Sequence, residues 1–472
     1  MKVLMVNIGF IPESLGGTEF YTYNLSRSLL QRGYEVTVLA AVEEMSSKRY
    51  SVTRTKLEGI EVIKIVNSPL FARSFNEHFQ DPIIDDLFVK IVQEKKPDLI
   101  HFQHVAYLSG NMFEIAYQMG IPSILTLHDY WYICFRSRLL RPNFGICPGP
   151  SEGSHCATCY ADSVPNPLAI SRSPLLMRLI GHTTMKSLIA NVMENVPEPI
   201  VSQARGLIFK DPEKNNTGNK NAASLIEKHS YRFDFFKKQL QYPRFILSPS
   251  EYLKRRYEEL GFREIFTLPL GYFQTNLERE NPSSSLNGGK LNIVLIGNIE
   301  RHKGVLVALK EILSLQKSDS VRINIYGRVK DPIYFSEIQK FIRQYPDENI
   351  KFHGEFRSDR DLKEIFSQNH IMMFPSTWEE NAPLVVREAL LHDTPVIGSK
   401  LGGVPEIIND GENGLLFDPF VEGDLAQRVN HILEKPHILE RIINGAKNSK
   451  IETMEDHVVK LEAFYHRALQ EN

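Results

Sequence analysis

The stretch IMMFPSTWEENAPLVVREALL, Ile371–Leu391, decides the fold class. Its first residues, Ile371–Phe374, are all apolar and predict a buried strand. A loop follows, and from Pro383 apolar residues recur every three to four positions, which predicts a helix. Proline is well placed at the first helical position, because its missing amide would have no partner there. A strand, a loop and a helix in this order are the building unit of a parallel α/β sheet.

The start of this helix is a candidate site for the phosphates of a ligand. The amides of Leu384 and Val385 would point out of the helix without partners, and the helix dipole adds partial positive charge. Glu380 in the loop and Glu388 one turn into the helix bracket this site. Carboxylates repel phosphate, so we expect them to bind hydroxyl groups, a sugar for one and a ribose for the other. Two glutamates eight residues apart also arise by chance, so spacing alone leaves an ordinary helix as the alternative.

Length, charge and hydropathy limit the number of domains and the class of protein that the chain can form. With 472 residues, the chain exceeds the limit of about 250–300 residues for one core, so we expect two domains. The 55 basic and 57 acidic residues predict no nucleic-acid groove. The N-terminal apolar run is too short for a signal peptide, and no apolar stretch is long enough to span a membrane. We expect a cytoplasmic protein, with peripheral contact at the inner face of the membrane left open.

Alternating strands and helices predict a Rossmann-like first domain over residues 1–276. Val3–Ile8 and Val36–Ala40 are expected strands that flank a helix from Glu19 to Gln31. Gly16 and Gly17 before this helix either let a ligand approach the backbone or simply make a turn. The loop lacks a GxGxxG fingerprint, which counts against a dinucleotide and hydride chemistry.

Two later strands of this domain end in polar residues. Leu99–Phe102 is followed by Gln103 and His104, and Ser123–Leu127 is followed by His128. Ligands of open parallel sheets bind beyond the carboxyl ends of the strands, so this position favours a site. A histidine that caps a strand through an ordinary hydrogen bond is the alternative. Further along, residues of about 165–240 are expected to form a helical insertion.

A second Rossmann-like series is expected over residues 291–453, after a linker rich in serine, proline and glycine at residues 277–290. Lys303 and Gly304 follow its first strand, Asn292–Ile296. A lysine there can place a point charge on a phosphate, although a lone surface lysine is common. Further strands are expected at Arg322–Tyr326, Asn349–His353 and Pro395–Gly398.

The four cysteines of the chain all lie in one loop, residues 134–159. Cys134, Cys147, Cys156 and Cys159 have the spacing C-x12-C-x8-C-x2-C, and the last pair has the spacing of structural zinc sites. A cytoplasmic chain is not expected to hold two disulfides. We expect a structural zinc ion bound by the four thiolates, with His155 able to replace one of them. Unliganded, partly buried thiols are the alternative.

Six runs of sequence, in this order, resemble family 4 of the retaining glycosyltransferases, which have the GT-B fold. They are GGTE (16–19), LHDYW (127–131), GNIERHKG (297–304), EENAPLVVREA (379–389), GGVPE (402–406) and NGLLF (413–417). The resemblance covers nearly the whole chain except about residues 165–240. It implies an α/β fold of two facing Rossmann-like domains with parallel sheets and an interdomain cleft. It also implies a C-terminal helix, residues 454–472, that crosses back to the first domain.

The resemblance also implies roles for individual residues, with the sugar nucleotide bound mainly to the second domain. By position, Glu380 would hold hydroxyls of the donor sugar and Glu388 the ribose. Lys303 would contact the diphosphate, and His128 would lie near the reacting end of the sugar. Gly16 and Gly17 belong to the matching GGTE run, so they are expected to contact the donor as well.

Two departures from the family pattern change these expectations. Asn298 stands where the family commonly has arginine, so Arg301 is expected to assist Lys303 at the diphosphate. Pro383 stands where the family commonly has glycine, which removes one amide from the donor loop.

We therefore expect a hexosyltransferase-like enzyme of polysaccharide biosynthesis. It would move a sugar from a nucleotide-diphosphate-sugar to a glycan or lipid-linked glycan. No carboxylate is placed as a nucleophile, so a front-face mechanism is expected, in which the acceptor attacks from the side that the diphosphate leaves. No catalytic metal is expected, because the aspartate-rich strand end of metal-dependent transferases is not evident. A sugar-nucleotide epimerase of the same architecture and a catalytically silent sugar-nucleotide-binding subunit are the alternatives.

Overall fold

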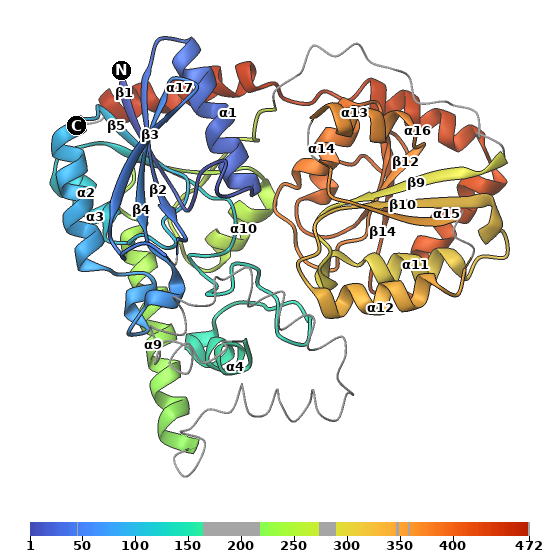
Figure 1. Cartoon of the computed structure of the whole chain (residues 1–472), viewed down its shortest axis with the longest axis horizontal. Coiled ribbons are helices and arrows are strands. Elements are labelled where there is room, and N and C mark those ends of the chain that lie inside the picture. Colours follow the sequence, from blue (N-terminus) through green and yellow to red (C-terminus); the bar gives the residue numbers. More distant parts are fainter. Residues whose placement is uncertain (45, 164–217, 273–288, 346–348, 357–358, 471–472) are drawn as a thin grey trace. The chain divides into compact units, whose positions relative to one another are not determined.

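The computed structural model describes residues 1–44, 46–163, 218–272, 289–345, 349–356 and 359–470 (Figure 1). The chain forms two compact units. Unit 1 comprises Met1–Pro249, Lys254–Leu268 and Met454–Asn472, and unit 2 comprises Ser250–Leu253 and Pro269–Thr453. Most of the expected helical insertion and of the expected linker lies outside the described residues.

Unit 1 is built on an eight-stranded sheet of order β3-β4-β2-β1-β5-β6-β7-β8. Strands β1, β5, β6 and β7 are buried along almost their whole length, as expected for parallel strands covered on both faces. All neighbouring strands are parallel except β3 and β4. The strands are β1 (Lys2–Asn7), β2 (Glu35–Val42), β3 (Val52–Leu57), β4 (Ile60–Val66), β5 (Leu99–Phe102), β6 (Ser123–Thr126), β7 (Phe245–Ser248) and β8 (Phe266–Thr267).

The hairpin of β3 and β4 was missed by the sequence analysis. Its turn is made by Glu58 and Gly59, both with positive φ (48° and 92°), as two-residue hairpin turns require. The outer strand β3, VTRTKL, is polar and mostly exposed, so it carries no apolar run that would mark it as a strand.

The last helix of the chain completes unit 1. Helix α17 (Met454–Gln470) packs on α1 (Gly17–Gln31) (Figure 1). The Tyr21 hydroxyl of α1 lies 2.6 Å from His457 Nε2 of α17. Tyr465 of the same helix lies 2.7 Å from His101 Nδ1 on β5. Among the described residues, the other α-helices with residues in this unit are α2 (Pro82–Lys95), α3 (Met112–Gln118), α4 (Ser154–Ser163), α9 (Gly218–Gln239) and α10 (Glu251–Glu259).

Unit 2 contains a six-stranded, fully parallel sheet of order β11-β10-β9-β12-β13-β14. Its strands are β9 (Leu291–Ile296), β10 (Val321–Tyr326), β11 (Ile350–Gly354), β12 (Ile371–Phe374), β13 (Val396–Ser399) and β14 (Gly414–Phe417). Its α-helices are α11 (Val305–Leu313), α12 (Pro332–Ile342), α13 (Asp359–Ser367), α14 (Leu384–Leu391), α15 (Asp424–Glu434) and α16 (His437–Lys447).

Both faces of the unit 2 sheet are covered by apolar side chains. Along β9, Ile293 and Leu295 belong to one hydrophobic cluster, whereas Val294 and Ile296 belong to the cluster on the other face. Successive side chains of a strand point to opposite faces, so this alternation explains the continuous apolar run. The two parallel-dominated sheets, each with helices around it, confirm the expected fold class of two Rossmann-like domains. In the described part of the chain, none of the helices has the length and apolarity needed to cross a membrane.

Candidate functional site

The loop between β12 and α14 has nearly the conformation that the sequence predicts. The helix begins at Leu384, and Pro383 is the residue before it, with an extended ψ of 116°. Pro383 is thus the N-cap rather than the first helical residue, and no side chain caps the helix there. The amides of Leu384 and Val385 have no hydrogen-bond partner within the described residues. They remain available as donors to an anion.

Glu380 and Lys303, both predicted from the sequence, lie together in unit 2. Glu380 is only 7% exposed, and one of its carboxylate oxygens forms an ion pair with the half-buried ammonium of Lys303. Ser376 Oγ donates to the same oxygen at 3.2 Å. The ammonium also lies 5.9 Å from the ring centre of Phe374 and 5.8 Å from that of Trp378, within cation–π range. Few positions are left to the lysine side chain, so its charge is held beside the loop that leads into α14.

Close approaches of the backbone fix this arrangement. Gly304, next to Lys303, has a φ of 71°, and a Cβ there would lie 1.9 Å from the carbonyl oxygen of Pro375. A Cβ at Gly402 would lie 2.1 Å from the Glu380 carbonyl oxygen, which accepts a hydrogen bond from the Gly403 amide at 2.7 Å. Larger residues at these positions would push the β12–α14 loop away from its neighbours.

Arg301 and Glu388 are placed differently from the Lys303–Glu380 pair. Arg301 Nη2 lies 2.5 Å from Glu337 Oε1 on α12, and its guanidinium lies 4.9 Å from the ring centre of Tyr334. The hydrogen bond with Glu337 raises the pKa of Arg301. Glu388 is half-buried on α14. Arg301 is therefore paired with Glu337 on α12. Its role at a diphosphate stays a prediction.

In unit 1, His128 follows β6 and is held by polar neighbours. Its Nε2 donates to Gln103 Oε1 at 2.8 Å, and its ring centre lies 5.3 Å from that of Tyr21. Burial, followed by the neighbouring imidazole of His104, lowers the pKa of His128 to about 3, and His457 acts in the same direction. The imidazole is therefore neutral near pH 7 and can exchange hydrogen bonds with a sugar without adding charge.

The start of α1 holds a buried carboxylate. Gly16 is the N-cap and Gly17 the first helical residue, two positions before the expected start at Glu19. Glu19 is 8% exposed, and Ser14 Oγ donates to it at 2.5 Å. A Cβ at Gly16 would lie 2.4 Å from Glu19 Oε2. No cation lies within ion-pair distance of Glu19 in the part of the chain that the structure describes.

The contact between Tyr21 and His457 beside this site was missed by the sequence analysis. The two residues lie 436 positions apart in the chain and neither belongs to a recognisable motif, so no local signal connects them. Only the return of α17 to unit 1 brings His457 close to Tyr21 and His128.

The four cysteines form no disulfide bond, and they line one small cavity of about 20 Å³ together with His155. Cys147 is buried, and Cys134, Cys156 and Cys159 are half-buried. Within the described residues, no group of three or more His, Cys, Asp or Glu side chains is already arranged to hold a metal ion. Zinc binding therefore stays a prediction.

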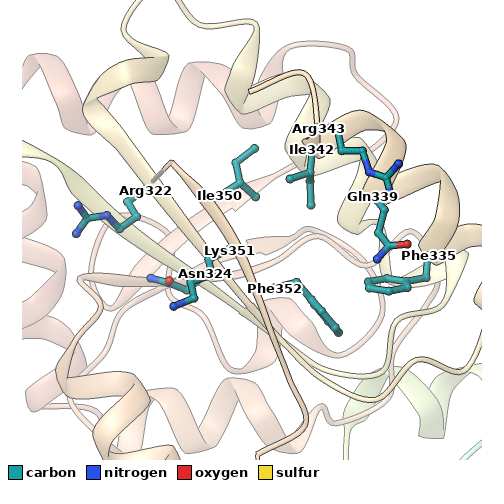
Figure 2. Close-up of a pocket in the computed structure, with 9 residues that line it drawn as sticks. All are labelled: Arg322, Asn324, Phe335, Gln339, Ile342, Arg343, Ile350, Lys351 and Phe352. Atoms are coloured by element: carbon teal, nitrogen blue, oxygen red, sulfur yellow. The ribbon is translucent and has the colours of Figure 1, made fainter. Parts of the chain in front are cut away.

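A pocket of about 760 Å³ lies elsewhere in unit 2, between the sheet edge at β11 and helix α12 (Figure 2). Arg322, Arg343 and Lys351 contribute its positive charge. It contains none of the residues predicted to bind a ligand, so it supports no role in the expected reaction.

Two known families match this chain. The family described as "Glycosyl transferases group 1" matches residues 277–449, and "Glycosyltransferase Family 4" matches residues 15–147. An uncharacterized 41.2 kDa protein in the cps region of Klebsiella pneumoniae is 30% identical over 127 residues, which are 27% of this chain and 32% of that protein. The aligned part spans less than half of the length of this relative and of two other curated relatives that the chain matches.

Solved structures of similar fold align over the whole chain. Sucrose-phosphate synthase from Thermosynechococcus elongatus has a TM-score of 0.63 at 15% identity and covers 100% of both chains. Anabaena HepE, solved in complex with UDP and glucose, has a TM-score of 0.60 at 15% identity and covers 99% of both chains.

Proposed function

Because the chain belongs to the family 4-like glycosyltransferases of GT-B fold, we propose that it is a retaining glycosyltransferase. Its donor is a nucleotide-diphosphate-sugar and its acceptor a glycan or lipid-linked glycan. The observation that carries the proposal is the Lys303–Glu380 pair beside the unpaired amides at the start of α14.

In the proposed reaction, the bond between the anomeric carbon and the diphosphate oxygen breaks while an acceptor hydroxyl oxygen bonds to the same carbon. Negative charge grows on the departing diphosphate. The Lys303 ammonium and the amides of Leu384 and Val385 stabilise that charge, which is commonly the largest catalytic contribution. The acceptor attacks from the face that the diphosphate leaves, so the hydroxyl proton passes to a phosphate oxygen and the configuration is retained.

The two glutamates have separate roles in this proposal. Glu380, already buried against Lys303, orients the ammonium and accepts hydrogen bonds from hydroxyls of the donor sugar. Glu388, half-buried on α14, accepts from the ribose. Because Lys303 and a helix start supply the positive charge, the reaction proceeds without a catalytic divalent metal.

Binding and product analysis test the proposal together. Thermal shift against UDP-, GDP- and ADP-sugars is expected to show one class that stabilises the protein at micromolar to millimolar concentration. With that donor and a glycan acceptor library, mass spectrometry is expected to show a transferred sugar, and NMR its retained anomeric configuration. An epimerised nucleotide sugar without transfer would instead establish the epimerase. Donor binding without any product would establish a silent subunit, and inverted configuration would overturn the front-face mechanism.

A further inference from the structure

Helix α9 carries a buried cation for which the described residues offer no carboxylate in ion-pair contact. Arg232 is 3% exposed, and its guanidinium lies 4.9 Å from the ring centre of Trp131 and 4.8 Å from that of Phe236. One amino group donates to the Trp131 carbonyl oxygen at 2.5 Å, but the buried Nε has no hydrogen-bond partner. Burying a charge without a counter-charge is costly, so a negative group is expected close by.

Sulfur atoms are candidates for that negative group. The Arg232 guanidinium lies 5.8 Å from the ring centre of Phe135, and Phe135 lines the same small cavity as Cys134 and Cys156. Ordinary thiols are mostly protonated at neutral pH and would leave the arginine uncompensated. Thiolates bound to a metal ion keep their negative charge at that pH.

The thiols are also gathered in space, although they are spread along the sequence. All four line the cavity of about 20 Å³, which has room for roughly one water-sized particle. Cys156 and Cys159 lie three positions apart on α4 and so share one face of that helix. Cys134 and Cys147 reach the same cavity from the loop that follows β6.

This loop contains little regular secondary structure. Leu140 and Ile146 form an isolated bridge, and no helix or named strand occurs between β6 and Ser151. Ser137, Leu139 and Phe144 adopt positive φ, which is unfavourable for residues other than glycine. A cross-link at its ends would hold such a segment in one conformation.

We propose that Cys134, Cys147, Cys156 and Cys159 bind one structural zinc ion as thiolates. Four thiolates and Zn²⁺ carry a net charge of about −2, which the buried Arg232 partly balances. The four protons leave the thiols when the metal binds. Since the side chains of the described residues are not already arranged around an ion, binding of zinc requires the four sulfur atoms to move closer together. The ion orders the loop that follows His128 and takes no part in bond making.

Elemental analysis of the full-length chain, purified without a histidine tag, tests this proposal. We expect about one equivalent of zinc per chain and four thiols that react with a thiol reagent only after denaturation. Less than about a tenth of an equivalent, with four thiols reactive in the native protein, would overturn it. Two disulfides detected by mass spectrometry would overturn it as well.

Cobalt replacement identifies the ligands without relying on a variant. We expect cobalt-loaded wild-type protein to show the absorption of a tetrahedral tetrathiolate site. A spectrum of oxygen or nitrogen ligands would overturn the four-sulfur assignment. The Cys156→Ser, Cys159→Ser double variant should lose the zinc, whereas His155→Ala, which changes the same cavity, should keep it. Arg232→Gln should release zinc to a chelator at least several-fold faster than Arg232→Lys, and equal rates would refute the role of the arginine charge.

Discussion

The loops that lead into α1 and α14 share a local architecture and differ in charge. Each follows a buried parallel strand, and a buried carboxylate lies where each loop meets its helix. This carboxylate is Glu19, in the first turn of α1, in unit 1 and Glu380, in the loop before α14, in unit 2. Glu380 is balanced by Lys303, whereas Glu19 is bound by the Ser14 hydroxyl and, within the described residues, by no cation. A helix start attracts a phosphate less when an unbalanced carboxylate stands beside it. The difference favours unit 2 for the diphosphate and unit 1 for hydroxyl groups.

The largest effect is expected from the cation itself. Lys303→Ala should lower turnover by about 10²- to 10³-fold, because it removes one donor to the developing charge and leaves Glu380 buried without its partner. Arg301→Ala is the matched control and should cost less than about threefold, since Arg301 pairs with Glu337 in a half-exposed site. Steady-state kinetics measure both. A larger loss of turnover from Arg301→Ala than from Lys303→Ala would show that Arg301, and not Lys303, is the main cation at the diphosphate.

Substitutions of Glu380 and Glu388 should change different kinetic constants. Glu380→Gln should chiefly lower turnover, by roughly 10- to 100-fold, because hydrogen bonds to a charged group contribute about 1.5–3 kcal/mol. Glu388→Gln should chiefly raise the donor Michaelis constant, by about tenfold, since the ribose is bound equally in ground and transition states. Two variants close to wild type would exclude this loop as the donor site.

The neutral histidine of unit 1 predicts a pH dependence of stability. His128 has an unfolded pKa near 6.5, and burial lowers its folded pKa to about 3. Above pH 6.5 it is neutral in both states. As the pH falls below 6.5, only the unfolded state gains the proton, so stability is lost, by roughly 2 kcal/mol at pH 5.

Thermal unfolding at pH 7 and pH 5 measures this loss. His128→Asn should lose less stability than wild type over the interval, whereas His437→Asn, at an exposed position on α16, should behave like wild type. An equal loss in His128→Asn and wild type would mean that His128 is protonated in the folded protein.

A smaller effect is expected at Glu19. Glu19→Gln should change the donor dissociation constant by less than about twofold, because no ion pair is lost, while Lys303→Ala should weaken binding at least tenfold. Isothermal calorimetry compares the two. Donor binding that becomes tenfold tighter in Glu19→Gln would place the diphosphate at α1 and reverse the contrast between the units.

The smallest effect is expected from metal removal during catalysis. If Lys303 supplies the charge at unit 2, EDTA added at the start of an assay should change the initial rate by less than about twofold. Rates that vanish with EDTA and return with magnesium or manganese, with the fold intact by circular dichroism, would contradict this expectation.

The parts of the fold that the sequence predicts are those with local causes. Strands buried on both faces, such as β9 and β12, appear in the sequence as continuous apolar runs, because an apolar cluster packs on each face of the sheet. Strand β3 escaped detection because its polar residues face solvent at the sheet edge. The start of α14 was misplaced by one residue, since the sequence fixes φ of Pro383 but not its ψ.

The candidate site shows the same limit. Motifs pointed to Lys303 and Glu380, which lie 77 positions apart, because each follows its own strand of one sheet. The partner of Arg301 on α12 and the contact between Tyr21 and His457 depend on how helices pack, which no local pattern records.

The position of α17 has a consequence for synthesis on the ribosome. Unit 1 includes Met1–Pro249 and also Met454–Asn472, so α17 emerges only after unit 2 has been synthesised. Unit 2, which requires nothing beyond Thr453, is complete first. At about 5–20 residues per second, α17 follows Leu268 by roughly 10–40 seconds. During that delay the surfaces of α1 and β5 that pack on α17 stay uncovered, so a nonsense mutation near residue 454 would damage the amino-terminal unit.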